Sequence, residues 1–244
     1  PYRVAENMYI RKIYPDMVYT FIDESELGKK EYVYSDLGYY YLKKIAEKLT
    51  AQSLDSYVKS NYYRKLGMSN TTYHPRDYFP LERLVPTEYD MSFRKQLIQG
   101  DVHDPGAAML GGVGGHAGLF SNANDLAKLM QMYLSMGEYG GERYISEATL
   151  KEFTRCQFCA NGNRRGLGFD KPEQKGKPGP TCDCVSYLSF GHSGFTGTYA
   201  WSDPDKQVVY IFLSNRVYPD AENKKLIDMN IRTKIQEAVY EVIR

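Results

Sequence analysis

The chain has 244 residues, a length that fits one sizeable domain or two small ones. Its 31 Lys and Arg residues nearly balance 30 Asp and Glu residues, which argues against a nucleic-acid-binding protein with a concentrated basic patch. No run approaches 18 consecutive apolar residues, so the sequence predicts no membrane span. The chain starts at Pro1 without a basic-then-apolar leader, and we expect it to be the inner part of a longer gene product.

The first half is predicted to consist of helices and loops. An aromatic run at residues 19–22 and a short run at 31–33 are strand-like, and residues 37–49 have the spacing of an amphipathic helix. The positions expected to be buried on that helix are Tyr41, Leu42, Ile45, Ala46 and Leu49. A second helix is predicted to begin after Ser53 and to close near Gly67. Residues 69–112 carry four prolines and are expected to form loops.

The second half contains a helix, two strands and a terminal helix. Asn122 and Asp125 predict a capped helix start, and residues 199–201 and 208–213 read as strands joined by the turn at 203–206. Residues 226–244 predict a helix whose buried side would carry Ile227, Ile231, Ile235, Val239 and Val242. This order of elements favours a layered α/β or α+β domain.

Several short motifs occur in a fixed order along the chain. They are Tyr34-Ser35-Asp36, the segments 65–71 and 114–121, His192-Ser193-Gly194 within 190–197, and the segment 213–217. Each motif alone is weak, because a tyrosine before a helix or a single H-S-G more often serves packing than catalysis. Five matched segments in order are specific.

Together these segments resemble the penicillin-binding, β-lactamase-related serine hydrolases, the family of class C β-lactamases, D,D-peptidases and related esterases. The resemblance runs from about Tyr32 to the C-terminus. It implies an antiparallel sheet flanked by helices, with a helical and loop insertion. We therefore expect residues 1–244 to be a single, incomplete domain of this type, with the Tyr34 motif in a helical and loop region at 31–150 and the sheet and terminal helix at 151–244.

The resemblance also implies acyl-enzyme chemistry, in which a serine attacks a carbonyl and its proton passes to a lysine and a tyrosine. Tyr34 would be that tyrosine. Asp36 replaces a frequent asparagine and brings a negative charge, which puts the substrate choice in question, while His192 replaces a frequent lysine. Ser193 and Gly194 would position the substrate, and the amide of Phe195 would donate to an oxyanion.

The family nucleophile, the serine of S-x-x-K, has no match before Tyr34. Two later matches begin at Ser56 and Ser92, but Ser56 is expected to face solvent and Ser92 lies in the loop region. Both serines follow Tyr34 in the chain, whereas the family nucleophile precedes the tyrosine motif at the start of a buried helix. We therefore expect the chain to be a C-terminal portion that lacks the nucleophile and is inactive alone.

Four cysteines form two close pairs, Cys156 with Cys159 and Cys182 with Cys184. Four thiols can hold a structural zinc ion, although C-x-C weakens that match. Disulfides are the competing interpretation in an oxidising compartment, and they are expected to cross between the pairs. Four reduced thiols are the third possibility, and the family chemistry requires no cofactor.

Other polar residues favour structural roles. We expect His116 to be a hydrogen-bonded structural residue and Arg216 to satisfy loop carbonyls. Arg164 and Arg165 could meet a substrate carboxylate, but a solvated loop pair is the favoured interpretation.

The leading hypothesis is a periplasmic or cell-envelope hydrolase that acts on a small-molecule or peptidoglycan-like amide or ester. The alternative is a non-catalytic relative that binds such ligands or a partner protein. As an incomplete folding unit, the chain would expose apolar surface and self-associate.

Overall fold

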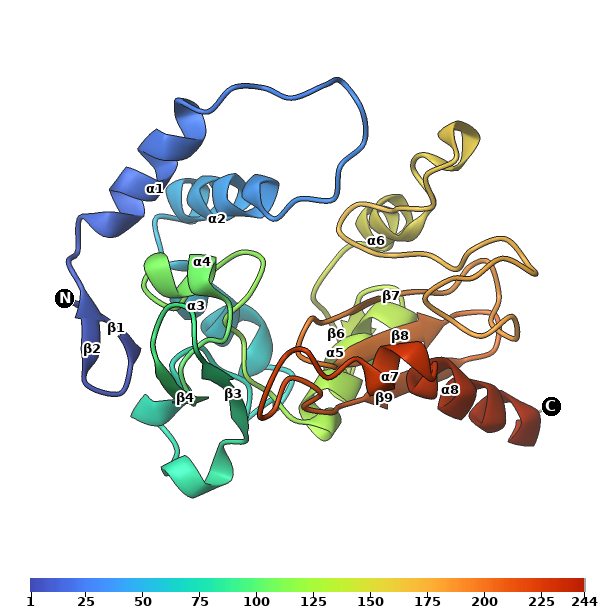
Figure 1. The fold of residues 1–244 in the computed structure, drawn as a ribbon. Helices are drawn as coiled ribbons and strands as arrows, with labels where there is room; N and C mark the ends of the chain where they lie inside the picture. The colour runs from blue at the N-terminus through green and yellow to red at the C-terminus, as the bar shows by residue number, and fades with distance from the viewer. Residues whose placement is uncertain (244) are drawn as a thin grey trace. The chain divides into compact units, whose positions relative to one another are not determined.

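In the computed structural model, which describes residues 1–243, the chain forms two units (Figure 1). The N-terminal unit comprises Pro1–Arg64, Asn70–Ser121 and Tyr218–Asp220. The C-terminal unit comprises Lys65–Ser69, Asn122–Val217 and the residues from Ala221 onward. None of the helices in the described part of the chain is long and apolar enough to cross a bilayer.

The N-terminal unit combines short helices with two antiparallel hairpins. Its strands are β1 (Tyr2–Ala5), β2 (Met8–Ile10), β3 (Pro86–Asp90) and β4 (Gln96–Gln99), and its α-helices are α1 (Tyr14–Asp23), α2 (Leu37–Thr50), α3 (Leu54–Val58) and α4 (Pro105–Met109). One π-turn follows α3 at Lys59–Tyr63, and two 3-10 turns lie at Pro75–Asp77 and Leu81–Arg83. The β3–β4 hairpin and α4 therefore give regular structure to part of the region predicted to be loops.

The strands predicted at residues 19–22 and 31–33 are wrong. Residues 19–22 belong to α1, which has Pro15 in its first turn, a position that suits proline because its missing N–H would be unsatisfied there anyway. Tyr19 is buried against the rest of the unit, and its hydroxyl donates to the carbonyl of Tyr40 at 3.0 Å. The tertiary contact of Tyr19 thus decides between helix and strand, where the aromatic run alone favours a strand.

Helix α2 begins at the predicted residue, but the expected buried face is wrong. Tyr40 is its buried residue, whereas Leu42, Ile45 and Leu49 are exposed, Leu49 to 81%. The apolar stripe of α2 is therefore a surface of the N-terminal unit in this structure.

The C-terminal unit is built on a three-stranded antiparallel sheet in the order β7-β8-β9. Its strands are β5 (Glu138–Tyr139), β6 (Glu142–Arg143), β7 (Phe190–Ser193), β8 (Tyr199–Asp203) and β9 (Val208–Phe212), and its helices are α5 (Ala123–Leu134), α6 (Glu147–Thr154), a 3-10 turn at Cys159–Asn161, α7 (Lys225–Asp228) and α8 (Ile231–Val242). The Asn122 side chain accepts a hydrogen bond from the Asp125 amide at 2.9 Å, which confirms the predicted cap of α5. The predicted strand pair, β8 and β9, is also confirmed.

Two helices cover opposite faces of this sheet (Figure 1). The Ser202 hydroxyl donates to the Met130 carbonyl of α5 at 3.1 Å. Neighbouring residues of a strand point to opposite faces, so Asp203 faces away from α5, and there it accepts a hydrogen bond from the Tyr240 hydroxyl of α8 at 2.9 Å. The α/β layering expected from the order of elements is confirmed.

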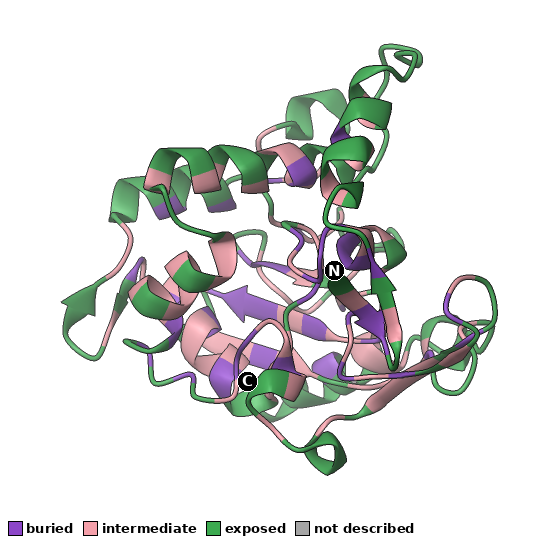
Figure 2. Ribbon diagram, turned by 90° about the vertical axis from the view of Figure 1, so that its left-hand side faces the viewer, coloured by how far each residue is buried: buried purple, intermediate pink, exposed green. Residues whose placement is uncertain are grey.

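The single terminal helix predicted at 226–244 is instead two helices. Asn230, with a left-handed φ of 53°, separates α7 from α8, and Arg244 lies outside the described residues. The buried residues of α8 are Gln236 and Tyr240, while the expected core positions Val239 and Val242 are exposed. Figure 2 shows the same contrast, with buried positions along strands and long exposed stretches along helices.

Candidate functional site

Strand β7 carries the H-S-G motif and is an edge strand of the three-stranded sheet. It pairs with β8 in an antiparallel register that sets His192 opposite Ala200 and Ser193 opposite Tyr199. Ser193, the last residue of the strand, is exposed, whereas Phe190 at its start is fully buried. The motif thus lies where the edge strand emerges from the core.

His192 is held by two contacts that define its protonation. Its Nε2 lies 3.1 Å from Nη1 of Arg165, and its Nδ1 lies 2.8 Å from the Ser193 carbonyl. A guanidinium can only donate, so Nε2 is the acceptor and Nδ1 carries the proton that it donates to the carbonyl. The imidazole is therefore neutral in this arrangement, and Arg165 supplies the positive charge beside it.

Gly194 and Phe195, which follow Ser193, lie in the turn after β7. A Cβ on Gly194 would lie 2.2 Å from the Thr198 hydroxyl, so a larger residue there would force the Thr198 side chain to move, and the Gly194 amide donates to the Thr198 carbonyl at 2.8 Å. Phe195 is 65% exposed, and the guanidinium of Arg216 lies 4.6 Å from its ring centroid. Arg216 also donates to the Phe195 carbonyl at 2.8 Å, which confirms its predicted role with loop carbonyls.

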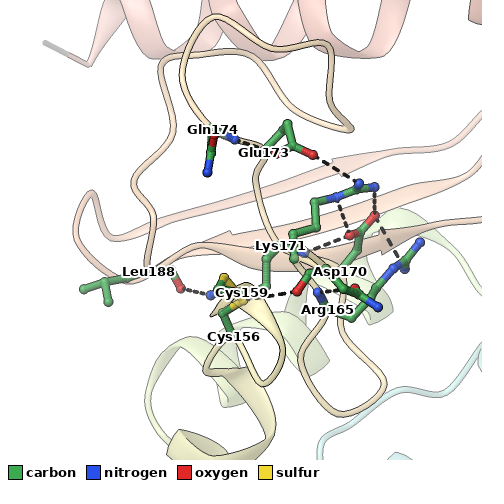
Figure 3. The surroundings of a disulfide bond; sticks show 10 residues. Cys156, Cys159, Arg165, Asp170, Lys171, Glu173, Gln174 and Leu188 are labelled. Carbon is green, nitrogen blue, oxygen red and sulfur yellow. Dashed lines mark hydrogen bonds and ion pairs between the residues drawn. A yellow bond between two sulfur atoms is a disulfide. The ribbon is translucent and has the colours of Figure 1, made fainter. Parts of the chain in front are cut away.

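Arg164 and Arg165 are not a solvated pair, and that favoured interpretation is wrong. Arg164 forms an ion pair with Asp170 at 2.9 Å and with Glu173 at 3.5 Å, and Arg165 lies 3.5 Å from the same Asp170 carboxylate (Figure 3). Asp170 is buried and exchanges two backbone hydrogen bonds with Gly191 of β7. Arg165 is the site residue whose position the sequence analysis missed, because 27 residues separate it from His192.

The four cysteines form two disulfides within the pairs, Cys156–Cys159 and Cys182–Cys184. The expectation that disulfides would cross between the pairs is therefore wrong. All four sulfurs are engaged in these bonds, and residues 1–243 contain no cluster of three or more His, Cys, Asp or Glu side chains that could hold a metal ion. Of the three interpretations of the cysteines, the structure has the disulfides.

Tyr34 and Asp36 lie in the N-terminal unit at the entrance to α2. Tyr34 is in an irregular segment and is 58% exposed. Asp36 occupies the N-cap position of α2 and is exposed, and its side chain makes no capping hydrogen bond. The structure brings these two residues together at one helix end, and it brings His192, Ser193, Gly194 and Phe195 together in the C-terminal unit.

The two downstream S-x-x-K matches have other partners. Ser56 is exposed, as predicted, and its hydroxyl bonds to that of Ser53 at 2.9 Å, while the amine of Lys59 lies over the Tyr78 ring. Ser92 is exposed in the β3–β4 turn, where its hydroxyl donates to the Asp90 carboxylate at 3.0 Å. These contacts stabilise local turns.

His116 has the structural role that we predicted. Its Nε2 lies 2.8 Å from the Asp104 carboxylate, and its ring stacks on Tyr40 with centroids 4.5 Å apart. Burial alone would raise the pKa of the Asp104 carboxyl, but hydrogen bonds from His116 and the Ala107 amide outweigh burial and lower that pKa. This cluster ties α2 and α4 together within the N-terminal unit.

Comparison with known proteins gives consistent results. The sequence profile of the β-lactamase family matches residues 24–230. A protein from Escherichia coli O157:H7 named "Putative D-alanyl-D-alanine carboxypeptidase" is 35% identical over 231 residues, which cover 89% of this chain and 52% of that protein. The chain thus spans about half the length of the curated relatives that it matches.

Two solved structures illustrate the similarity of fold. A β-lactamase from Mycobacterium bovis superposes with a TM-score of 0.58 at 21% identity, covering 86% of this chain and 64% of that one. A penicillin-binding protein from Bacillus halodurans gives a TM-score of 0.60 at 14% identity, covering 91% and 64%. These similarities show a common fold with β-lactamase-like and penicillin-binding proteins.

Proposed function

The chain belongs to the β-lactamase family, and on that premise we propose that its protein is a serine acyl-hydrolase of the β-lactamase, D,D-peptidase and esterase type. In this reaction a serine oxygen attacks an amide or ester carbonyl, the leaving group departs with a proton, and water then hydrolyses the acyl-enzyme. The nucleophilic serine belongs to an S-x-x-K segment outside these 244 residues, so the chain alone is inactive. The chain forms a single, incomplete domain in this proposal.

The observation that carries the proposal is the end of β7, where an edge strand meets the Arg165–His192 pair. Gly191 already pairs with Asp170 along this edge, so an extended substrate would add its main-chain hydrogen bonds at the Ser193 end of the strand. A guanidinium beside that edge provides the forked donors that suit a carboxylate. This combination fits a short acyl peptide or peptidoglycan-like substrate better than an uncharged ester.

The remaining site residues take the roles that the family resemblance implies. Tyr34 acts as the general-base partner of the serine, and Asp36, His192, Ser193 and Gly194 position the substrate. The Phe195 amide donates to the oxyanion. The reaction needs no cofactor, and the protein acts in the periplasm or cell envelope.

Hydrolysis assays on the full-length protein test this function. We expect turnover of an acylated D-amino-acid dipeptide or a small ester, with the released product measured by mass spectrometry. Tyr34→Phe removes the proton acceptor and should lower kcat by roughly 100-fold, whereas Tyr32→Phe, two residues earlier and also exposed, should leave kcat unchanged. Equal activity of the two variants would contradict the role of Tyr34.

A second candidate is a non-catalytic relative that binds peptidoglycan-like ligands or a partner protein. The departures at Asp36 and His192 from the residues frequent in the family favour it. Tight binding of a peptidoglycan fragment by the full-length protein, without turnover, would favour this candidate over the hydrolase.

A further inference from the structure

We propose that the Cys156–Cys159 disulfide is a redox-sensitive clamp that holds Arg165 against His192 and so sets the affinity of the site for a substrate carboxylate. The substrate half of this inference rests on the proposed function. The mechanical half, in which opening the disulfide releases Arg165, depends only on contacts within the C-terminal unit.

The clamp is a narrow hairpin in which the disulfide joins two residues of the first arm. The Gln157 amide donates to the Arg165 carbonyl at 2.9 Å, and the Asn163 amide donates to the Phe158 carbonyl at 3.2 Å. The Arg165 amide in turn donates to the Asn163 side chain at 3.0 Å. The disulfide joins Cys156 and Cys159, the residues on either side of Gln157 and Phe158. It therefore fixes the segment whose Gln157 amide holds the Arg165 backbone.

The Arg165 side chain depends on this backbone position. Asp170 holds Arg164 closely at 2.9 Å, but its distance to Arg165 is 3.5 Å, longer than an ordinary charge-assisted hydrogen bond. The tighter contact of Arg165 is with His192 at 3.1 Å. A shift of the hairpin would therefore move Arg165 away from His192 while Arg164 keeps its ion pair.

The two disulfides differ in how easily a reductant can reach them. Cys156 and Cys184 are both half-buried, but Cys159 is exposed whereas Cys182 is only 8% exposed. Figure 3 shows the Cys156–Cys159 bond beside the Arg165 loop. A dithiol attacks through its thiolate, forms a mixed disulfide and then closes its own ring. The S–S bond gains two electrons and two protons to give two thiols, and the dithiol is oxidised to a cyclic disulfide.

Chemical modification of the full chain tests the mechanical half. Phenylglyoxal reacts with accessible arginines, and peptide mass spectrometry measures the rate at each one. In C156S/C159S, or in the wild-type chain reduced with dithiothreitol, the rate at Arg165 should rise by about threefold or more, while exposed Arg155 serves as an internal reference. C182S/C184S is the matched control and should leave the Arg165 rate unchanged. An unchanged Arg165 rate in C156S/C159S, with the circular dichroism spectrum of the wild type, would overturn the proposal.

Kinetics of the full-length protein test the substrate half. C156S/C159S should raise KM for an acyl peptide with a free carboxylate by roughly tenfold, with kcat and the KM of its C-terminal amide little changed, because a charge-assisted contact is lost. Arg165→Lys should show part of the same loss, since lysine keeps the charge without the fork. Released Arg165 with unchanged KM would overturn the carboxylate role. Absence of turnover in every form, including the wild type, would instead contradict the proposed hydrolase, and equilibrium binding of the two peptides would then measure the same discrimination.

Discussion

At the end of β7 the neutral imidazole of His192 lies beside the guanidinium of Arg165. His192 accepts from Arg165 and donates to the Ser193 carbonyl, so it fixes the geometry, and Arg165 carries the charge. A lysine at position 192 would place a mobile point charge there, whereas a guanidinium presents planar, paired donors. The positive charge at this end of β7 thus comes from an arginine on a different loop.

Lys171 gives the clearest prediction of pH dependence. It is 5% exposed, its amine donates to the Leu188 carbonyl at 2.9 Å, and burial lowers its pKa from 10.5 to about 8, with Asp203 acting in the opposite direction. Between these two values the unfolded chain binds the proton and the folded chain does not. The free energy of unfolding should therefore rise with pH over this window, by up to about 3 kcal/mol.

Urea unfolding of the wild type and Lys171→Met at pH 8 and pH 10 measures this effect. The wild-type gain between the two pH values should exceed that of Lys171→Met, and the comparison cancels the titration of the many tyrosines. An identical gain in the free energy of unfolding in both proteins would show that the pKa of the Lys171 amine is not lowered in the folded chain.

The residues of the site differ in how far the sequence could predict them. Short motifs mark His192 and Gly194 because their neighbours in sequence are also their neighbours in space. Arg165 reaches His192 only through the fold of the loop at 155–170, and the sequence pattern of that loop is polar and irregular. The pairing of Cys182 with Cys184 was also not predictable from the sequence, since a separation of two residues disfavours a disulfide in most backbone conformations.

Among the elements, the β8–β9 turn is tied to the rest of the C-terminal unit by one carboxylate. Asp203 is fully buried and accepts hydrogen bonds from the Ser186 amide at 2.8 Å and from the Tyr240 hydroxyl at 2.9 Å. It also accepts from the amides of Asp205 and Lys206 in its own turn. These donors come from three separate segments, so the carboxylate connects the sheet, α8 and the loop before β7.

Asp203→Asn should lower the free energy of unfolding by about 2–4 kcal/mol, because an amide NH2 would face donors that need an acceptor. Asp205→Asn, in the same turn but on an exposed side chain, is the matched control and should change it by less than about 0.5 kcal/mol. Chemical denaturation monitored by circular dichroism distinguishes the two. Equal stabilities of the two variants would contradict the connecting role of Asp203.

The cap of α5 and the β8–β9 strand pair were predictable from local signals, but the buried faces of helices were not. The Asn122 cap and the alternation of β8 act within a few residues. Which side of a helix is buried depends on what packs against it, and on α8 the polar Gln236 and Tyr240 face the sheet while apolar residues face outward. The apolar periodicity of α2 and α8 therefore predicts helices correctly and their buried sides incorrectly in this chain.

For the whole molecule, these exposed apolar faces favour self-association. Leu42 and Leu49 on α2, and Val239 and Val242 on α8, are exposed in their respective units. Apolar surface of this kind drives association in water. We expect the 244-residue chain to form a dimer or a swapped assembly, measured by light scattering over a dilution series, and a monomer that persists at high concentration would contradict this.

Intact-mass spectrometry after incubation with a penicillin-type acylating probe shows whether the nucleophilic serine lies outside these 244 residues. Both the 244-residue chain and a longer form that begins upstream should be treated under the same conditions. We predict a covalent adduct on the longer form alone, located by peptide mapping at the serine of an S-x-x-K segment. An adduct on Ser56 or Ser92 of the short chain, or no adduct on either form, would contradict it.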